Sequence, residues 1–324
     1  QIFTRSDCGN LLSWNLNPRA NPVKFIGHKG SINEISINPI GNYIASCSND
    51  CTVHLWNNTI HGLSKVLQLH NSPIKSVNFA PNGQFIVTGS VDKTMKLYSL
   101  GANKVLSEFS GHRDAIKNVR VSPNSKSIAS CGDDKTIKLW DINRKICLTS
   151  YNDHLKSVNC VRWSPNGLSI VSCSNDHKIK LFDIRCPKAI QHYDAHNNNV
   201  TSISFHPSGR YLVSCSLDST IKIWDLYNAS LWYTLYGHEG PVYSVSFNKT
   251  GEFICSGGVD GILMIWRNNL NNNLIPDEIN NKIMGGEAYM NPKLIVKDKN
   301  KKRAKSCNKV NVSVNVNINT FMKI

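Results

Sequence analysis

The sequence contains no long apolar run. No stretch approaches the roughly 18 consecutive apolar residues that a membrane-spanning helix needs, and no apolar segment near the start resembles a signal peptide. The chain starts with Gln1, so this observation covers only the residues present. The 11 cysteines are an odd number and cannot all pair with one another. Without a secretion signal, we expect reduced thiols.

Acidic residues are scarce relative to basic ones. The chain has 22 Asp and Glu against 37 Lys and Arg, a formal charge of +15. That balance favours acidic partners, namely nucleic acid, anionic lipid or an acidic protein surface. The sequence also lacks a glycine-rich P-loop and an acidic pair recurring outside turns, so it offers no support for an enzyme. Hydrophobic residues make up 40% of the chain, which permits a buried core and excludes wholesale disorder.

Four kinds of residue recur every 42 positions. They are a histidine line (His28, His70, His112, His154, His196, His238), a hydroxyl line (Ser46, Thr88, Ser130, Ser172, Ser214, Ser256), an aspartate line (Asp50, Asp92, Asp134, Asp176, Asp218, Asp260) and an aromatic line (Trp14, Trp56, Tyr98, Trp140, Phe182, Trp224, Trp266). Regular repeats of this length are typical of repeat architectures.

Each period contains the signals of short antiparallel strands. Ile221 and Ile223 alternate with Thr220, Lys222 and Trp224, which is a strand pattern. Asp residues supply one turn per repeat, and Pro-X-Gly sequences supply another.

Gly-His and Trp-Asp pairs identify the repeat. Gly27-His28, Gly111-His112 and Gly237-His238, with Trp140-Asp141 and Trp224-Asp225, resemble the WD-repeat family. The resemblance covers nearly all of residues 1–266 and implies one four-stranded propeller blade per repeat. The fold expected is therefore all-β, a seven-bladed WD-repeat β-propeller.

The first blade is expected to be truncated at the N-terminus. Its histidine would precede residue 1, so we predict that it lacks its innermost strand and part of the next. In the family, the N-terminal strand completes the last blade; its absence predicts an unpaired edge. We divide the chain into an N-terminally incomplete propeller, residues 1–269, and a basic, Asn-rich, disordered tail, residues 270–324.

Ser130, His112 and Asp134 could be interpreted as the nucleophile, base and orienting acid of a hydrolase. The resemblance implies a structural network instead, in which Asp, His, Ser or Thr, and Trp form one hydrogen-bonded chain, and six copies fit that role better than catalysis. We therefore predict no catalytic residue. The network residues proposed are His28, Ser46, Asp50, Trp56, His112, Ser130, Asp134, Trp140, His196, Ser214, Asp218, Trp224, His238, Ser256, Asp260 and Trp266.

The network is incomplete in three repeats. Tyr98 and Phe182 replace Trp, and Phe cannot donate a hydrogen bond. In the first repeat, Cys8 stands at the aspartate position. These blades are expected to be less tightly held.

No metal site or cofactor is expected. Histidines on six successive blades lie around a ring and do not converge on one ion. Cys47 and Cys51 have zinc-like spacing but lack a second pair. Six repeats place cysteine or glycine in one register, which indicates small, buried thiols: Cys47, Cys131, Cys173 and Cys215 against Gly89 and Gly257.

In WD-repeat proteins, residues following the histidine and the turn aspartate point to the top face, where partners bind. The candidates here are Lys29, Asn71, Arg113, Lys156, Asn198, Lys93, Lys135 and His177, with Glu239 the acidic exception. The alternative is a solvated rim without a partner.

The last repeat suggests a subfamily. Residues 233–242 through Trp266, with Gln191-His192-Tyr193 and 205–212, resemble the proteome-of-centriole WD-repeat proteins. This resemblance implies a non-enzymatic scaffold of the cytoplasm and cytoskeleton, located at the centriole or basal body, which stabilises centriolar microtubules and supports cilium assembly. Its partners would be proteins such as tubulin or centriolar wall components, with no small-molecule substrate, no membrane and no nucleic acid.

The tail departs from that subfamily, because residues 267–324 contain no sustained heptad pattern for a coiled coil. The basic run 297–305 is interpreted as a solvated segment, or as a nuclear-localisation or nucleic-acid patch. Residues 310–319 alternate like a strand but have no obvious partner. The alternative function is an adaptor subunit of a nuclear complex for chromatin or RNA processing.

Overall fold

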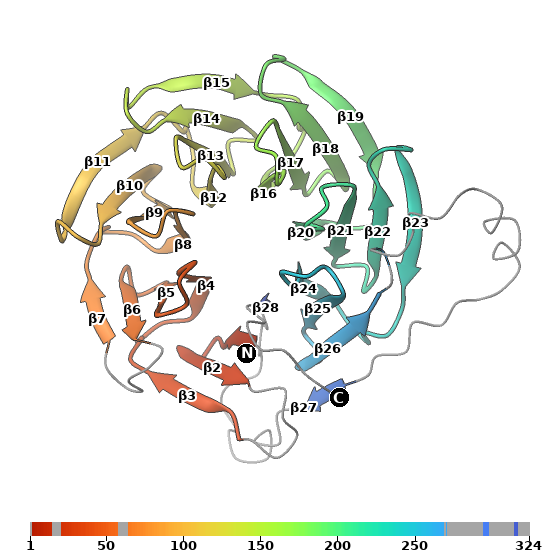
Figure 1. Ribbon diagram of the computed structural model, residues 1–324, viewed down its shortest axis with the longest axis horizontal. Coiled ribbons are helices and arrows are strands. Elements are labelled where there is room, and N and C mark those ends of the chain that lie inside the picture. The colour runs from red at the N-terminus through yellow and green to blue at the C-terminus, as the bar shows by residue number, and fades with distance from the viewer. Residues whose placement is uncertain are drawn as a thin grey trace, which may run out of the picture.

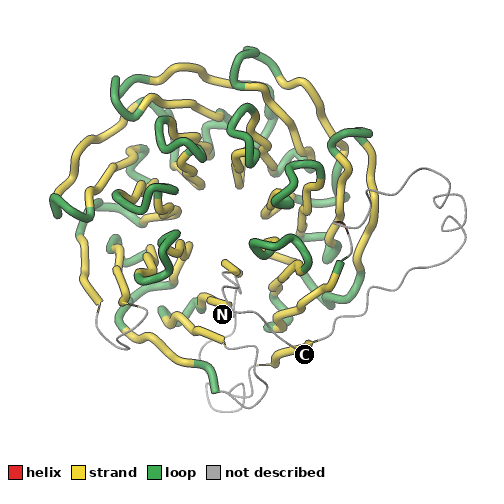
Figure 2. Tube along the Cα trace, in the orientation of Figure 1, coloured by secondary structure: helices red, strands yellow, loops and turns green. Residues whose placement is uncertain are grey.

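The computed structural model describes residues 2–14, 21–57, 64–268, 270, 294–297 and 314–316. They form seven antiparallel sheets of four strands, arranged as blades around a central opening (Figure 1). Figure 2 shows a ring built of strands and loops, and no helix in the described part of the chain could cross a membrane. The all-β, seven-bladed fold expected from the 42-residue period is confirmed.

Blades 2 to 6 each take four consecutive strands, ordered from the innermost to the outermost. They are β4 (Ile32–Ile37), β5 (Tyr43–Ser48), β6 (Val53–Asn57) and β7 (Ser64–Leu67); β8 (Ile74–Phe79), β9 (Phe85–Ser90), β10 (Thr94–Ser99) and β11 (Lys104–Ser110); β12 (Ile116–Val121), β13 (Ser127–Gly132), β14 (Ile137–Asp141) and β15 (Cys147–Tyr151); β16 (Val158–Trp163), β17 (Ser169–Ser174), β18 (Lys178–Asp183) and β19 (Ala189–Asp194); and β20 (Val200–Phe205), β21 (Tyr211–Ser216), β22 (Ile221–Asp225) and β23 (Ser230–Leu235).

Blades 1 and 7 each combine three consecutive strands with one strand from the C-terminal region. Blade 1 has β1 (Ile2–Arg5), β2 (Asn10–Trp14) and β3 (Val23–Ile26), and blade 7 has β24 (Val242–Phe247), β25 (Phe253–Gly258) and β26 (Ile262–Arg267). The added strands are β28 (Val314–Val316) on the inner side of β1 and β27 (Leu294–Lys297) on the outer side of β26.

These added strands correct two expectations. The outer edge of blade 7, the last blade, was expected to be unpaired, but β27 runs antiparallel to β26 there, with Leu263 opposite Val296. Blade 1 was expected to lack its innermost strand, but β28 runs antiparallel to β1, with Phe3 opposite Asn315. The alternating segment 310–319, for which no partner was expected, therefore supplies the innermost strand, and Figure 1 shows β28 beside the central opening. The rest of the tail, including most of the basic run 297–305, lies outside the described residues, and its disorder stays a prediction.

The apolar core lies between neighbouring blades. One cluster joins Val213 and Ile223 of blade 6 to Val245 and Trp266 of blade 7. Equivalent clusters lie between each pair of consecutive blades from blade 1 to blade 6. The sheets of blades 2 to 6 are therefore covered on both faces. This explains why Trp224, which the strand alternation grouped with polar residues, is buried, as is Ile223 on the opposite face.

Polar side chains on the innermost strands link each blade to the next. In one row, the side-chain oxygen of an inner-strand residue accepts a hydrogen bond from a backbone N–H of the following blade. The pairs are Glu34 with Val77 (3.2 Å), Ser76 with Val119 (3.0 Å) and Asn118 with Val161 (3.3 Å). These bonds satisfy buried backbone donors and hold the inner strands in register around the opening.

Candidate functional site

The expected network of Asp, His, Ser or Thr, and Trp forms, and blade 4 shows it in full. His112 places Nδ1 2.8 Å from Asp134 and Nε2 2.7 Å from Ser130, while the Trp140 indole N–H donates to Ser130 Oγ at 2.8 Å. Because an indole N–H can only donate, Ser130 Oγ accepts a hydrogen bond from Trp140, and the Ser130 hydroxyl donates a hydrogen bond to Nε2 of His112. The His112 Nδ1–H then donates to the carboxylate. The four side chains form one directed hydrogen-bond chain.

Blades 2, 6 and 7 contain the same chain, with His–Asp distances of 2.8, 3.0 and 2.7 Å. Its members are His28, Ser46, Asp50 and Trp56; His196, Ser214, Asp218 and Trp224; and His238, Ser256, Asp260 and Trp266. The structure thus brings together every network residue proposed from the sequence.

Blades 3 and 5 lack the indole donor. Thr88 and Ser172 still contact their histidines, at 2.8 and 2.7 Å. The Tyr98 hydroxyl turns away from Thr88 and donates to Asn103, and Phe182 has no donor to offer. The weaker network expected for these blades therefore corresponds to one missing hydrogen bond in each.

Blade 1 keeps a fragment of the network that the sequence reasoning missed. The Trp14 indole N–H donates to Thr4 Oγ1 at 2.8 Å. Thr4 lies one period of 42 residues before Ser46, so extending the hydroxyl line by one step finds it.

The turn aspartates hold two loops together on one face of the propeller, which we call the upper face. In blade 4, Asp134 accepts at Oδ2 from the Arg113 backbone N–H at 3.0 Å and at Oδ1 from the Thr136 N–H at 3.1 Å. Burial by itself would raise the pKa of Asp134, but the hydrogen bonds from His112, Arg113 and Thr136 outweigh it and lower the pKa well below its usual range. Blade 5 behaves alike, and the pKa of Asp176 falls to about 2.

Histidine, hydroxyl, aspartate and tryptophan at these offsets are the signature of one family. A family model, WD domain, G-beta repeat, matches residues 20–57, 62–99, 103–141, 145–183, 187–225 and 229–267. The chain belongs to the WD40 repeat family. A curated relative, the ribosome biogenesis protein BOP1 homolog of Dictyostelium discoideum, is 44% identical over 39 residues, 12% of this chain. That match spans 5% of the relative's length.

The glycine of the Gly-His pair makes room for tryptophan in this WD40 propeller. A Cβ on Gly27 would lie 2.8 Å from Cη2 of Trp56, and one on Gly237 would lie 2.9 Å from Cη2 of Trp266. Where Tyr98 or Phe182 replaces Trp, the glycine position holds another residue, Leu69 or Asp153. Blade 6 is the exception, because it contains Trp224 but has Ala195 at the glycine position.

The Ser-His-Asp geometry by itself resembles a catalytic triad, but the serine is not accessible in the way that a catalytic nucleophile is. Ser130, like the hydroxyl residues of blades 2, 3, 5, 6 and 7, has a relative exposure of 0%. A nucleophile must contact its substrate. The hydroxyl of Ser130 is instead used within the Trp140–His112 chain.

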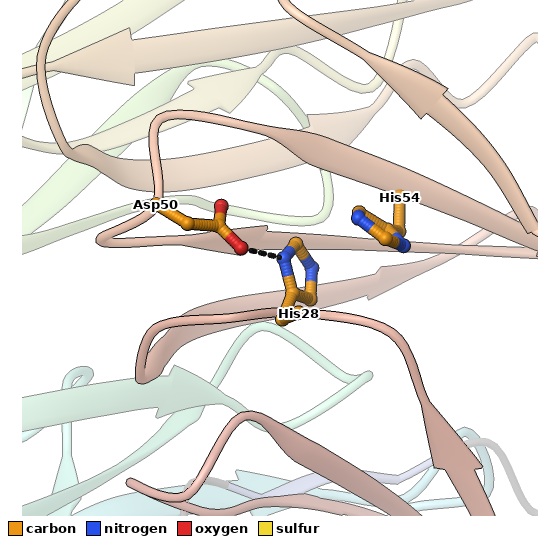
Figure 3. A group of neighbouring side chains, drawn as sticks. All are labelled: His28, Asp50 and His54. Atoms are coloured by element: carbon orange, nitrogen blue, oxygen red, sulfur yellow. Dashed lines mark hydrogen bonds and ion pairs between the residues drawn. The ribbon is translucent and has the colours of Figure 1, made fainter.

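His28, Asp50 and His54 form the cluster closest in composition to a metal site among the described residues (Figure 3). The His54 ring lies 3.9 Å from the His28 ring, between centroids. Both nitrogens of His28 are already engaged, with Asp50 and Ser46 at 2.8 Å each. A metal ion would have to break that chain, so these residues do not fit one. Burial and the neighbouring His28 lower the pKa of His54 to about 4.

The cysteines follow the expected register. Cys47, Cys131, Cys173 and Cys215 are buried in second strands, and the described cysteines form no disulfide. Cys51, at zinc-like spacing from Cys47, lies instead in the turn, where its thiol approaches the Asn49 carbonyl. Burial raises the pKa of Cys215 to about 12, which keeps that thiol protonated.

The proposed partner-binding residues reach solvent on the upper face. Seven of the eight are exposed and His177 is half-buried: Lys29, Asn71, Lys93, Arg113, Lys135, Lys156 and Asn198 are the exposed set. Lys29, Asn71 and Arg113 directly follow the repeat histidine, whereas Lys156 and Asn198 lie one residue further on. The positions directly after His154 and His196 are Leu155 and Asn197. Leu155 is 73% exposed, an apolar feature of this face that the charge pattern did not indicate.

Three of these residues are held in left-handed backbone. The φ angles of Lys93, Lys135 and His177 are 70°, 65° and 70°. Non-glycine residues rarely adopt this conformation, and here the preceding aspartate stabilises it by accepting from the N–H that follows, as Asp92 does from Thr94 at 2.9 Å. The upper face therefore presents Lys93 and Lys135 from turns whose backbone the aspartates hold.

Proposed function

We propose that this WD40 propeller is a non-enzymatic protein-interaction scaffold whose upper face binds an acidic protein surface, and that it acts at the centriole or basal body. The observation that carries the proposal is the exposure of Lys29, Lys93, Arg113, Lys135 and Lys156 on one face, with Lys93 and Lys135 in left-handed turns. Long-range attraction to an acidic partner speeds association and orients it. Tubulin surfaces are acidic, so the centriolar microtubule wall is the proposed partner, with a role in microtubule stability and cilium assembly.

Co-pelleting with polymerised microtubules tests the contact. The variant Lys93→Glu/Lys135→Glu should reduce the bound fraction several-fold at low ionic strength. The matched control is Lys126→Glu, an exposed lysine at the opposite end of strand β13 from Lys135. Binding should weaken as salt rises, because the charges are exposed. Equal binding by the double variant and the control would contradict the upper face as the contact.

A second candidate is an adaptor in a nuclear RNA-processing complex. The partial likeness to a ribosome biogenesis protein and the basic run 297–305 favour it. Imaging a tagged protein separates the two candidates: discrete foci at centrosomes or basal bodies support the first, and a nuclear or nucleolar signal supports the second.

A further inference from the structure

The central opening of the propeller is a cavity of about 890 Å³. It is lined by the innermost strands of blades 2 to 7 and, from blade 1, by Arg5. This volume falls in the range of small-molecule pockets, which run from about 300 to 1,000 Å³.

The cavity wall carries an excess of positive charge. Its cationic side chains are Arg5, Lys75, Lys117, Arg120, Arg162 and Lys249. Its acidic side chains are Glu34 and Asp133. Among the lining residues that the structure describes, six cations against two carboxylates leave a formal excess of +4.

Both carboxylates are already paired. Asp133 Oδ1 lies 2.8 Å from Lys117 Nζ at the upper mouth of the cavity. Glu34 forms an ion pair with Arg120 and accepts from the Ser76 hydroxyl. The two carboxylates therefore form ion pairs with Lys117 and Arg120 and not with the other cations of the wall.

Three of those cations contact only neutral groups among the described residues. Arg162 donates from Nη1 to Asn118 Oδ1 and to the Val161 carbonyl, each at 3.0 Å. Lys75 Nζ donates to Asn49 Oδ1 at 3.0 Å. Arg5 donates from Nη1 to the Ile32 carbonyl at 2.7 Å, and its buried Nε has no partner.

Glu34 is the acidic residue that acts on all three arginines of the cavity wall. Its carboxylate favours the charged form of Arg5, Arg120 and Arg162 alike, so one acid serves three guanidinium groups. Burial, reinforced by the Arg120 charge, lowers the pKa of Arg162. Buried charge without a counter-ion is costly, and an anion in the cavity would remove that cost.

We propose that the central cavity binds a small polyanion carrying several phosphate groups, held by the guanidinium groups of Arg162 and Arg5 and by Lys75. Guanidinium forks match phosphate oxygens in a bidentate geometry. Several phosphates in one ligand suit cations that belong to different blades, and a formal excess of +4 suits a multiply charged anion better than a single carboxylate. The site is separate from the proposed contact with an acidic protein.

Isothermal titration calorimetry of the full chain with tripolyphosphate and with inositol hexakisphosphate tests the proposal. We expect one polyanion per chain for at least one of the probes. Arg162→Gln should weaken that affinity about tenfold or more, since charge-assisted hydrogen bonds contribute about 1.5–3 kcal/mol. Arg144→Gln, an exposed arginine on a β14–β15 loop, is the matched control and should leave it unchanged.

If Arg162→Gln fails to fold, Lys75→Gln replaces it, since Lys75 has a single neutral partner. Bound polyanion should also raise Tm of the wild-type chain and of Arg144→Gln. Absence of binding by both probes would overturn the proposal. So would binding that Arg162→Gln and Arg144→Gln weaken equally.

Discussion

Arg120, on the innermost strand of blade 4, forms an ion pair with Glu34, on the innermost strand of blade 2, and so passes across blade 3. Ser76 and Asn118 contribute further hydrogen bonds to the same carboxylate. The centre of the propeller is thus held by a polar cluster shared among three blades.

Replacing Glu34 should destabilise the whole propeller. Glu34→Gln leaves Arg120 without its counter-ion, and breaking a buried ion pair costs about 3–5 kcal/mol. Urea unfolding measures the change. Lys96→Gln, which removes the more exposed Lys96–Glu108 pair, is the control and should cost less than about 1 kcal/mol. A similar loss in both variants would contradict a central role for Glu34.

Removing a network hydroxyl should lower the free energy of unfolding more in a blade whose network contains tryptophan. Ser130→Ala leaves both Nε2 of His112 and the Trp140 N–H without a partner, whereas Ser172→Ala leaves only Nε2 of His154 without one. Each unsatisfied buried group costs about 1–3 kcal/mol, so Ser130→Ala should be the more destabilising by at least about 1 kcal/mol.

Thermal or chemical unfolding of the two serine variants makes the comparison. An active-site serine probe provides a second readout and should label neither Ser130 nor Ser172. Selective labelling of Ser130, with stability unchanged in Ser130→Ala, would instead support the hydrolase hypothesis.

Gly237→Ala should destabilise blade 7. The added Cβ would lie 2.9 Å from Cη2 of buried Trp266, so the ring or the loop must shift. Overpacking of this kind costs about 1–3 kcal/mol. Gly101→Ala is the control because a Cβ there meets nothing within 4 Å. Equal unfolding midpoints for the two variants would show that the tryptophan does not require glycine.

Stability should fall as the pH drops below neutral. Burial lowers the pKa of His196 from 6.5 to about 4, so below pH 6.5 the unfolded chain takes up protons that the folded chain refuses. The stability that His196 contributes is complete above pH 6.5 and is lost between pH 6.5 and about 4. His28 and His70 act in the same direction.

The aspartates extend this loss to lower pH. The pKa of Asp176 falls from 3.8 to about 2, because its hydrogen bonds outweigh burial. Its contribution is complete above pH 3.8 and is lost as the pH falls towards 2. Tm measured from pH 8 to pH 2 checks both windows. A Tm that stays constant between pH 7 and pH 5 would contradict the histidine assignment.

Shortening the C-terminus should expose blade 1. A chain ending at residue 309 lacks β28 and leaves the inner edge of β1 unpaired, which lowers Tm and promotes association between copies. A chain ending at residue 318 keeps β28 and serves as the control. Light scattering and thermal unfolding compare the two, and identical behaviour would argue against pairing of β28 with β1.

Much of the fold and of the networks followed from the sequence. The 42-residue period places His112, Ser130, Asp134 and Trp140 within one repeat, and local strand pairing then brings them together. The same arithmetic identifies Thr4 once the hydroxyl line is extended. Such contacts are predictable because hairpins join residues that are close in sequence.

Other features depended on closure of the ring. Arg120 reaches Glu34, 86 residues away, only because three inner strands surround one cavity, and no periodic line relates an arginine to a glutamate. The pairing of β28 with β1 joins distant parts of the chain through backbone groups, which any extended segment possesses. The sequence determined the repeat and the contents of each blade; the tertiary structure decided which charges and which strand edges meet at the centre.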